Sequence, residues 1–233
     1  MLRALNNFIG LRECRLALSG AAPIAPDMLR FFRALGVPIR EGYGMTETAG
    51  VVTVQRSAAS PVGTVGSAVP GVELRIADDG ELLVRGPTVF KGYYRNDAAT
   101  AEAIDTEGWL HTGDVAQAVR GPEGEEVRIV DRKKDMILVS GFNVYPTEIE
   151  QVVSLHPGVL ECAAVGIPDE RSGEAVKLFV VKKDGATISE DDIAGYCRDN
   201  FTAYKRPKII EFRDDLPKSN VGKILRRELR SDH

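Results

Sequence analysis

Residues 131–150, DRKKDMILVSGFNVYPTEIE, are the stretch that most constrains the fold of this chain. Five charged residues, 131–135, are followed without an intervening loop by the apolar run 136–139. We therefore expect a solvated segment that leads directly into a buried strand. After a short polar passage, Thr147 and Glu150 have the spacing of a capping box, which predicts the start of a helix.

This order of signals fits an extended junction between two packed bodies, which would be residues 1–130 and 131–233. A chain of 233 residues is long enough for two modest domains or for one large domain. On this stretch alone, the simpler interpretation is a transition from surface to core within one domain. The remainder of the chain reverses that preference.

The N-terminal residues have the pattern of a strand–helix–strand unit, with a short strand at 15–19 and a helix at 26–35. Strands in such a unit are parallel, so the loops that follow them, residues 19–23 and 41–48, open on one edge of the sheet. Ligands bind along that edge in α/β folds. Because a parallel sheet must be covered on both faces, we expect this chain to be the C-terminal part of a longer protein.

The pattern then changes to strands separated by tight turns between residues 63 and 130, which predicts an antiparallel sheet. After the junction, the order helix, strand, strand, helix, strand, helix predicts a small α+β lobe. The predicted fold class is therefore α/β and α+β: a βαβ fragment with an antiparallel β subdomain, followed by that lobe.

Composition excludes several other classes of protein. Lys and Arg total 30 and Asp and Glu total 34, so the net charge of −4 gives no electrostatic reason to expect nucleic acid as a partner. No apolar run is long enough to cross a bilayer, and the N-terminus lacks the features of a signal peptide, so we expect a cytoplasmic protein. Three scattered cysteines and three histidines support neither a disulfide framework nor a zinc site.

The first chemical signal is the motif YGMTE, which follows the second strand of the βαβ unit. The ring of Tyr43 can stack on a base, Gly44 leaves the turn flexible, and the hydroxyl of Thr46 can contact a phosphate. The carboxylate of Glu47 can hold a hard cation such as Mg²⁺. The alternative is a glycine-containing turn in which the threonine hydroxyl bonds its own backbone.

Two further residues are candidates for nucleotide chemistry. Asp114 follows GWLHTG at the end of a predicted strand, where its carboxylate could accept hydrogen bonds from ribose hydroxyls. Lys223 lies in a polar glycine loop that could carry its charge to an anionic transition state. The alternatives are an aspartate that forms a turn and a lysine that is solvated.

Four motifs of this chain are much more specific together than singly: YGMTE, GWLHTGD, DRKKD and the GK loop. From Gly42 to Arg227 the chain resembles the adenylate-forming superfamily. DRKKDMILVSGFNVYP and PKSNVGKILRREL look most like the corresponding parts of its long-chain fatty-acyl-CoA ligases. This resemblance implies that residues 1–130 are the C-terminal part of an adenylation domain and that residues 131–233 are its small mobile lobe.

The resemblance also implies a two-step reaction in which ATP activates a fatty acid as an acyl-adenylate and coenzyme A then takes the acyl group. Mg²⁺ would accompany the ATP. By similarity, Lys223 would bridge the fatty-acid carboxylate and the α-phosphate. The other implied contacts are an adenine and acyl pocket at Gly20, Ala21 and Ala22, adenine at Tyr43 and Gly44, phosphate at Thr46, Mg²⁺ at Glu47, and ribose at Asp114 and Arg132.

Further implied roles concern the second step. Lys134 would be the pivot about which the lobe turns, and Gly141 would face the pantetheine tunnel, although Gly141 could instead simply end a strand. Lys205, Arg206 and Arg226 could attract coenzyme A phosphates, and a solvated basic face explains them equally well.

The chain lacks the Ser/Thr/Gly-rich phosphate loop that lies upstream in the superfamily, so we expect it to be inactive alone. Alternatives are an aryl- or other acyl-CoA ligase, a peptide-synthetase adenylation domain, or a noncatalytic fragment that binds a nucleotide or a partner. The residues leave open the acyl chain length, peripheral association with membranes and the oligomeric state.

Overall fold

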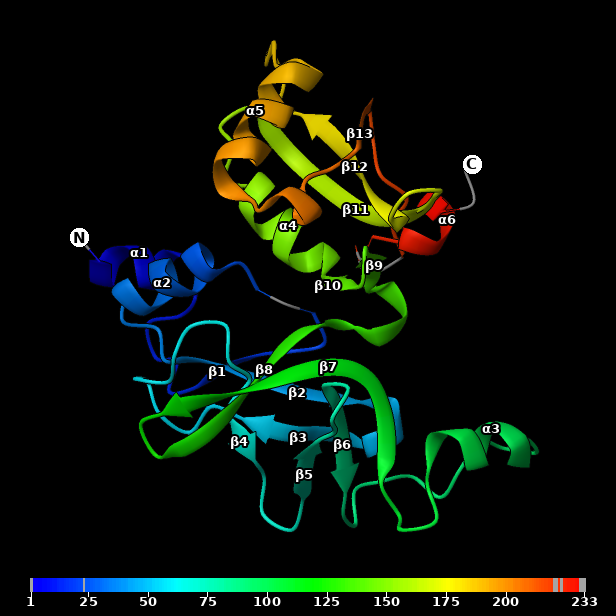
Figure 1. The fold of residues 1–233 in the computed structure, drawn as a ribbon. Helices are drawn as coiled ribbons and strands as arrows, with labels where there is room; N and C mark the ends of the chain where they lie inside the picture. Colours follow the sequence, from blue (N-terminus) through cyan, green and yellow to red (C-terminus); the bar gives the residue numbers. More distant parts are fainter. Residues whose placement is uncertain (1, 23, 220–221, 223, 231–233) are drawn as a thin grey trace. The chain divides into compact units, whose positions relative to one another are not determined.

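The computed structural model describes residues 2–22, 24–219, 222 and 224–230 (Figure 1). The chain divides into two units, Met1–Ile129 and Val130–His233. Their assignment as an adenylation domain and a mobile lobe stays a prediction.

The N-terminal unit begins with the predicted βαβ arrangement. Pro26 occupies the first turn of the helix, where its missing N–H leaves no bond unmade, and Leu29 is fully buried. Gly36 follows the helix with a φ of +82°, a conformation that favours glycine. The first two strands are parallel and the others antiparallel, in the order β1-β2-β3-β4. The elements are α1 (Leu2–Phe8), β1 (Ala17–Ser19), α2 (Pro26–Ala34), β2 (Ile39–Met45), β3 (Gly50–Val54) and β4 (Ser67–Ala68).

A second sheet of the N-terminal unit has the order β5-β6-β7-β8. The pairings of β5 with β6 and of β6 with β7 are antiparallel, as predicted. Apolar side chains from both sheets, including Val52 of β3 and Leu82 of β6, form one buried cluster. Gly66 approaches β3 so closely that a Cβ atom would lie 2.0 Å from the carbonyl carbon of Val54. The elements are β5 (Glu73–Ile76), β6 (Glu81–Arg85), α3 (Asp97–Ala103), β7 (Leu110–Gly121) and β8 (Gly124–Arg132).

The C-terminal unit is built on a five-stranded sheet with the path β10-β9-β12-β11, in which β13 also pairs with β12. Successive residues of β12 point to opposite faces, so Leu178 joins one apolar cluster and Phe179 the other. Both faces of this strand are therefore buried. The elements are β9 (Ile137–Val139), β10 (Phe142–Val144), α4 (Pro146–Val153), β11 (Val159–Asp169), β12 (Gly173–Lys182), α5 (Glu190–Asn200), β13 (Ile209–Arg213) and α6 (Arg226–Arg230). The predicted fold class, α/β with α+β, is confirmed.

The charged stretch before β9 differs from the prediction of a fully solvated segment. Asp131 and Asp135 are only 5% and 9% exposed, because arginines of α6 pair with their carboxylates. The three basic residues between them are exposed. The strand that follows is also less buried than predicted, since Leu138 points outward and is 47% exposed.

The predicted capping box at the start of α4 is wrong. The helix begins at Pro146, one residue before Thr147, with Tyr145 at the N-cap position. The backbone N–H of Thr147 donates to Asp131 Oδ2 at 2.8 Å, so a distant carboxylate caps the helix. Glu150 turns away from the cap and accepts hydrogen bonds from the backbone N–H of Ala164 and from Arg226.

Within the described residues, no helix combines the length and the hydropathy that crossing a bilayer requires.

Candidate functional site

Two of the predicted nucleotide-binding residues, 71 positions apart in the chain, meet in the N-terminal unit. Tyr43 of β2 donates its hydroxyl hydrogen bond to Asp114 Oδ2 of β7 at 2.6 Å. Asp114 is buried, and its backbone N–H donates to Thr112 Oγ1 at 3.1 Å. Thr112 in turn donates to the backbone oxygen of Leu82 on β6 at 2.7 Å. The phenol of Tyr43 therefore contacts the carboxylate, while Thr112 links the backbone of Asp114 to the neighbouring strand β6.

Gly44 is required here by the backbone rather than by a ligand. The pairing of β2 with β3 shifts register between Tyr43 and Gly44. At this bulge, a Cβ atom on Gly44 would lie 1.9 Å from the carbonyl oxygen of Gly50. The glycine thus allows β3 to approach β2 directly after the tyrosine.

Replacing Gly44 by alanine is expected to destabilise the N-terminal unit by about 1–3 kcal/mol, since the backbone must move to accept the methyl group. Urea unfolding followed by the fluorescence of Trp109 measures this, because the chain has one tryptophan and it lies in this unit. Gly195, inside α5, is the matched control. Its replacement by alanine adds the same methyl group in the other unit, so the unfolding midpoint reported by Trp109 is expected to stay unchanged. An unchanged midpoint for Gly44→Ala would contradict the steric explanation.

Thr46 and Glu47 lie on a single turn of 3₁₀ helix, Thr46–Thr48, directly after β2. Thr46 is exposed and Glu47 is half-buried. The hydroxyl that bonds the backbone on both sides of the turn belongs instead to Thr48. It accepts from the backbone N–H of Met45 at 3.0 Å and donates to the carbonyl oxygen of Gly50 at 2.8 Å. The carboxylate of Glu47 accepts a hydrogen bond from Tyr93 Oη at 2.8 Å. Sequence reasoning did not single out Tyr93.

Residues 20–22 follow β1, the strand that lies parallel to β2. A Cβ atom on Gly20 would lie 3.0 Å from the carbonyl oxygen of Gly42, immediately before Tyr43. Ala21 has a φ of +67°, a conformation that non-glycine residues seldom adopt. The structure therefore brings the loop of Gly20, Ala21 and Ala22 close to the start of the YGMTE turn.

The remaining predicted site residues belong to the C-terminal unit. Lys223 lies outside the described residues. Arg132 and Lys134 are exposed, and the carbonyl oxygen of Lys134 accepts a hydrogen bond from Arg230 Nη1 at 3.2 Å. Gly141 has a φ of +84° in the two-residue turn between β9 and β10, and a Cβ atom there would have no described neighbour within 4 Å. Its backbone conformation, rather than crowding, accounts for glycine at this position.

Arg226 is neither solvated nor available to an anion, which corrects the expectation that it attracts coenzyme A phosphates. Its side chain is 18% exposed and binds Glu150 Oε2 through Nη2 at 2.6 Å. Nη1 lies 3.5 Å from Asp135 Oδ2 and 3.8 Å from Asp131 Oδ1. Burial raises the pKa of Glu150, and the hydrogen bonds from Arg226 oppose that shift. One guanidinium therefore joins three carboxylates from separate elements.

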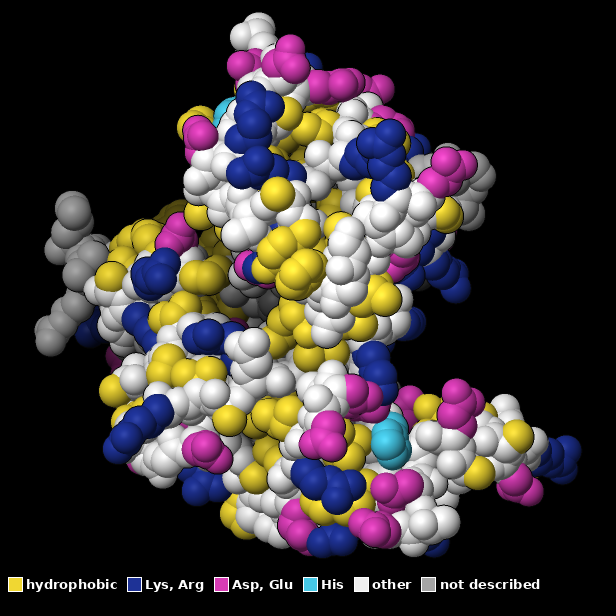
Figure 2. Space-filling view, viewed as in Figure 1, with side chains coloured by type: hydrophobic (Ala, Val, Ile, Leu, Met, Phe, Trp, Pro, Cys, Tyr) yellow, Lys and Arg dark blue, Asp and Glu magenta, His cyan; other side chains and the backbone are white. Residues whose placement is uncertain are grey.

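A pair of aromatic side chains was also missed from sequence. The rings of Phe142 and Tyr204 are stacked, with centroids 4.6 Å apart. Lys205 Nζ binds both oxygens of Glu148, at 2.6 and 2.8 Å, while Arg206 donates to the backbone oxygen of Phe201. Lys205 is therefore half-buried in an ion pair, whereas Arg206 is exposed, which leaves the solvated alternative open for Arg206. On the face that Figure 2 displays, acidic and basic side chains are interspersed.

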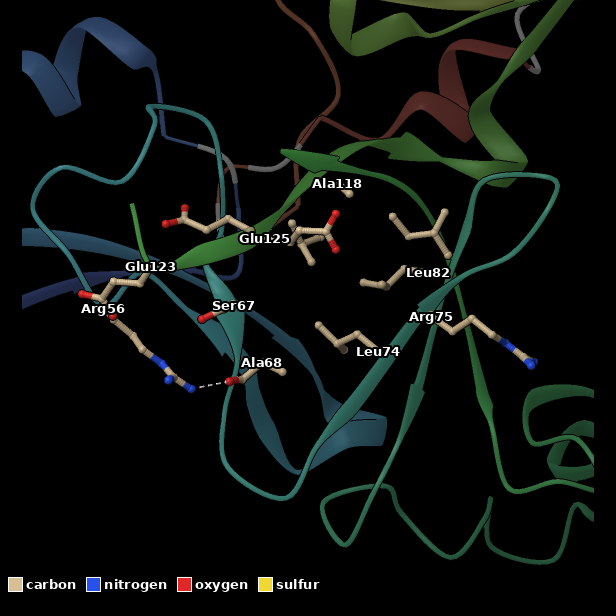
Figure 3. A pocket seen from close by; sticks show the side chains of 12 residues that line it. Arg56, Ser67, Ala68, Leu74, Arg75, Leu82, Ala118, Glu123 and Glu125 are labelled. Atoms are coloured by element: carbon tan, nitrogen blue, oxygen red, sulfur yellow. Dashed lines mark hydrogen bonds between the residues drawn. The ribbon is translucent and has the colours of Figure 1, made fainter. Parts of the chain in front are cut away.

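A cavity of about 580 Å³ lies elsewhere in the N-terminal unit, between β4 and the strands of the second sheet. Figure 3 shows Leu74, Leu82 and Ala118 around it, with Arg56 donating to the backbone oxygen of Ala68 at its margin. Its described lining includes none of the residues predicted to contact nucleotide. The cavity is thus separate from the Tyr43–Asp114 pair.

Comparison with known proteins finds two family models along the chain. Residues 3–94 match the model described as AMP-binding enzyme, and residues 148–223 match the AMP-binding enzyme C-terminal domain. A long-chain-fatty-acid–CoA ligase of Escherichia coli O157:H7 is 52% identical over 229 residues, which are 93% of this chain and 40% of that protein. A 3-[(3aS,4S,7aS)-7a-methyl-1,5-dioxo-octahydro-1H-inden-4-yl]propanoyl:CoA ligase of Rhodococcus jostii is 41% identical over 227 residues, covering 95% of this chain and 43% of the relative.

Among solved structures, ATP-bound MatB from Rhodopseudomonas palustris superposes with a TM-score of 0.87 and 37% sequence identity. The match covers 95% of this chain and 46% of that structure. The chain therefore spans less than half the length of the proteins that it matches.

Proposed function

This chain belongs to the AMP-binding enzyme family, and from that premise we propose that it forms part of a long-chain fatty-acid–CoA ligase. The observation that carries the proposal is the 2.6 Å contact between Tyr43 and Asp114, which sets a ring and a carboxylate side by side. An adenosine presents a flat base and two ribose hydroxyls, which such a pair can recognise.

The proposed reaction has two steps. A fatty-acid carboxylate oxygen attacks the α-phosphorus of ATP, and pyrophosphate leaves. The sulfur of coenzyme A then attacks the acyl carbon, so that a thioester forms and AMP leaves. Activation is needed because a carboxylate offers a thiol only an oxide leaving group, whereas AMP is a much better one.

In the first step, the ring of Tyr43 would stack on adenine while Asp114, together with Arg132, holds the ribose. Thr46 would donate to a phosphate oxygen, and Gly20, Ala21 and Ala22 would line the adenine and acyl pocket. The half-buried carboxylate of Glu47 suits a hard cation, since Mg²⁺ prefers oxygen ligands. Bound Mg²⁺ would neutralise the phosphate charge. Lys223 would supply the mobile cation between carboxylate and α-phosphate.

In the second step, the C-terminal unit would turn about Lys134 and withdraw Lys223 from the path of the thiol. A large turn of the backbone at Lys134 would have to break the hydrogen bond from Arg230 to its carbonyl oxygen. Gly141 would face the pantetheine tunnel. The stacked rings of Phe142 and Tyr204, with Arg206 nearby in sequence, would offer an apolar and cationic surface to coenzyme A.

The test is hydroxamate trapping of the acyl-adenylate by the complete ligase, with palmitate and benzoate compared at equal concentration. We expect palmitate to be activated and benzoate not. The reverse preference would favour an aryl- or other acyl-CoA ligase, a candidate supported by the 41% identity to the Rhodococcus jostii enzyme. No trapped product with any acid would support a noncatalytic fragment. The proposed location is the cytoplasm, where ATP and coenzyme A are present.

Replacing Tyr43 by phenylalanine is expected to raise the KM for ATP about fivefold to tenfold in the complete ligase. The ring remains to stack on adenine, but Asp114 loses the neutral donor that orients it, at a cost of about 1 kcal/mol. If Asp114 binds the ribose, the increase in KM caused by Tyr43→Phe should be smaller for 2′-deoxy-ATP than for ATP. Equal losses with both nucleotides would argue against ribose recognition by Asp114.

A further inference from the structure

The segment of residues 90–100 contacts the Glu47 turn at two points. The backbone N–H of Phe90 donates to the backbone oxygen of Glu47 at 2.7 Å. Tyr93 then donates its hydroxyl hydrogen bond to Glu47 Oε1 at 2.8 Å. One contact fixes the backbone of the turn and the other engages the carboxylate.

Tyr93 is itself held in place by packing and hydrogen bonds. Its ring meets that of Phe90 edge to face, with centroids 4.9 Å apart. Its backbone N–H donates to Thr100 Oγ1 at 2.9 Å. Gly92 has a φ of +144°, and a Cβ atom there would lie 2.6 Å from Thr100 Cγ2. The backbone before Tyr93 thus takes a conformation available to glycine, and the ring has a defined direction.

The hydrogen bond leaves Glu47 able to bind a cation. A carboxylate has about four acceptor positions on its two oxygens, and the phenol uses one of them. A phenol is protonated at neutral pH and therefore acts as the donor in this contact. A half-buried glutamate side chain still has several rotamers, and a fixed donor reduces that freedom.

We propose that Tyr93 is a positioning residue, whose hydroxyl holds the Glu47 carboxylate in the direction needed to bind the divalent cation that accompanies ATP. The inference rests on the proposed function, because it assigns Glu47 to that cation. Partners that orient metal-binding side chains in this way commonly contribute 10–100-fold to metal affinity.

The test compares Tyr93→Phe with the native residue in the complete ligase, using Mn²⁺ as the probe in the presence of ATP. Electron paramagnetic resonance reports bound Mn²⁺ without any turnover. We expect Mn²⁺ affinity to fall about tenfold. The Mg²⁺ concentration for half-maximal adenylation should rise by a similar factor, while kcat at saturating Mg²⁺ stays near the native value. The substitution retains the ring that packs on Phe90.

The adjacent tyrosine supplies a matched control. Tyr94 is 85% exposed and its ring contacts the guanidinium of Arg95, so Tyr94→Phe should leave Mn²⁺ affinity unchanged. Equal Mn²⁺ affinities for Tyr93→Phe, Tyr94→Phe and the native enzyme would overturn the inference and leave the proposed function intact. Absence of ATP-dependent Mn²⁺ binding and of adenylation in the native enzyme would overturn both.

Discussion

Replacing Arg226 by methionine is expected to lower the free energy of unfolding of the C-terminal unit by about 3–5 kcal/mol at neutral pH. The substitution leaves Glu150, Asp135 and Asp131 close together without the guanidinium that joins them. Breaking a partly buried ion cluster by removing one partner costs far more than losing an exposed ion pair, because the remaining charges stay desolvated. Urea unfolding followed by far-ultraviolet circular dichroism measures the loss.

The effect of Arg226→Met should depend on pH. Burial raises the folded-state pKa of Glu150, and removal of Arg226 takes away the hydrogen bonds that oppose this rise. A carboxylate whose pKa is raised on folding binds its proton more tightly in the folded state, so it favours folding at low pH. That contribution is lost as pH rises through the folded-state pKa. The destabilisation should therefore be smaller at pH 5 than at pH 7.

Two variants test whether the cluster, rather than arginine in general, is responsible. Arg171 is exposed in the turn between β11 and β12, and Arg171→Met should change stability by less than about 0.5 kcal/mol. Arg226→Lys keeps the charge but loses the planar fork, so an intermediate loss is expected. Hydrogen exchange of residues 131–150 should rise in Arg226→Met, since Asp131 would no longer be held beside the start of α4. If Arg226→Met had the native free energy of unfolding and native hydrogen exchange, the cluster would not stabilise the C-terminal unit.

Replacing Lys223 by alanine is expected to reduce acyl-adenylate formation by about 100–1000-fold in the complete ligase. This residue lies outside the described residues, and the expectation comes from the proposed function. The carboxylate and the α-phosphate are both anionic and repel each other as they approach. A cation positioned between them offsets this repulsion most strongly where the negative charge is concentrated. Pyrophosphate exchange measures the first step directly.

The second step provides the internal control for Lys223→Ala. When acyl-adenylate is supplied, thioester formation should retain most of its native rate, because the proposed lobe movement removes this lysine from the thiol path. Lys183 is exposed after β12, and Lys183→Ala removes the same charge without an expected change in either step. Equal losses in both steps, or a lowered melting temperature, would indicate a structural role for Lys223 instead.

Local signals in the sequence predicted most of the elements correctly. The apolar spacing and glycine stop of α2 predicted a βαβ unit, and β1 and β2 are indeed parallel. The second helix predicted for the α+β lobe appears as α5, where Ser189 and Asp192 form a reciprocal cap. In both cases, the residues that decide the structure lie within one or two turns of each other, so their spacing is visible in the sequence.

The same local rule failed at α4, and the reason is tertiary. Thr147 and Glu150 have the correct spacing for a reciprocal cap, but Asp131 reaches the helix start and Arg226 draws Glu150 away. Charged groups were likewise predicted to be solvated, although buried opposite charges from distant elements compensate them. Spacing cannot reveal a partner that is brought into contact only by folding.

Taken alone, the sequence determined the types of secondary structure, the parallel pair and the set of candidate residues, because turn chemistry and hydrophobic periodicity act between near neighbours. Tertiary structure decided which candidates share partners: Tyr43 with Asp114, Glu47 with Tyr93, and Arg226 with three carboxylates. The two residues of each pair are 46 or more positions apart in the chain. Their contacts depend on sheet register and on the burial of charge, which are properties of the folded chain as a whole.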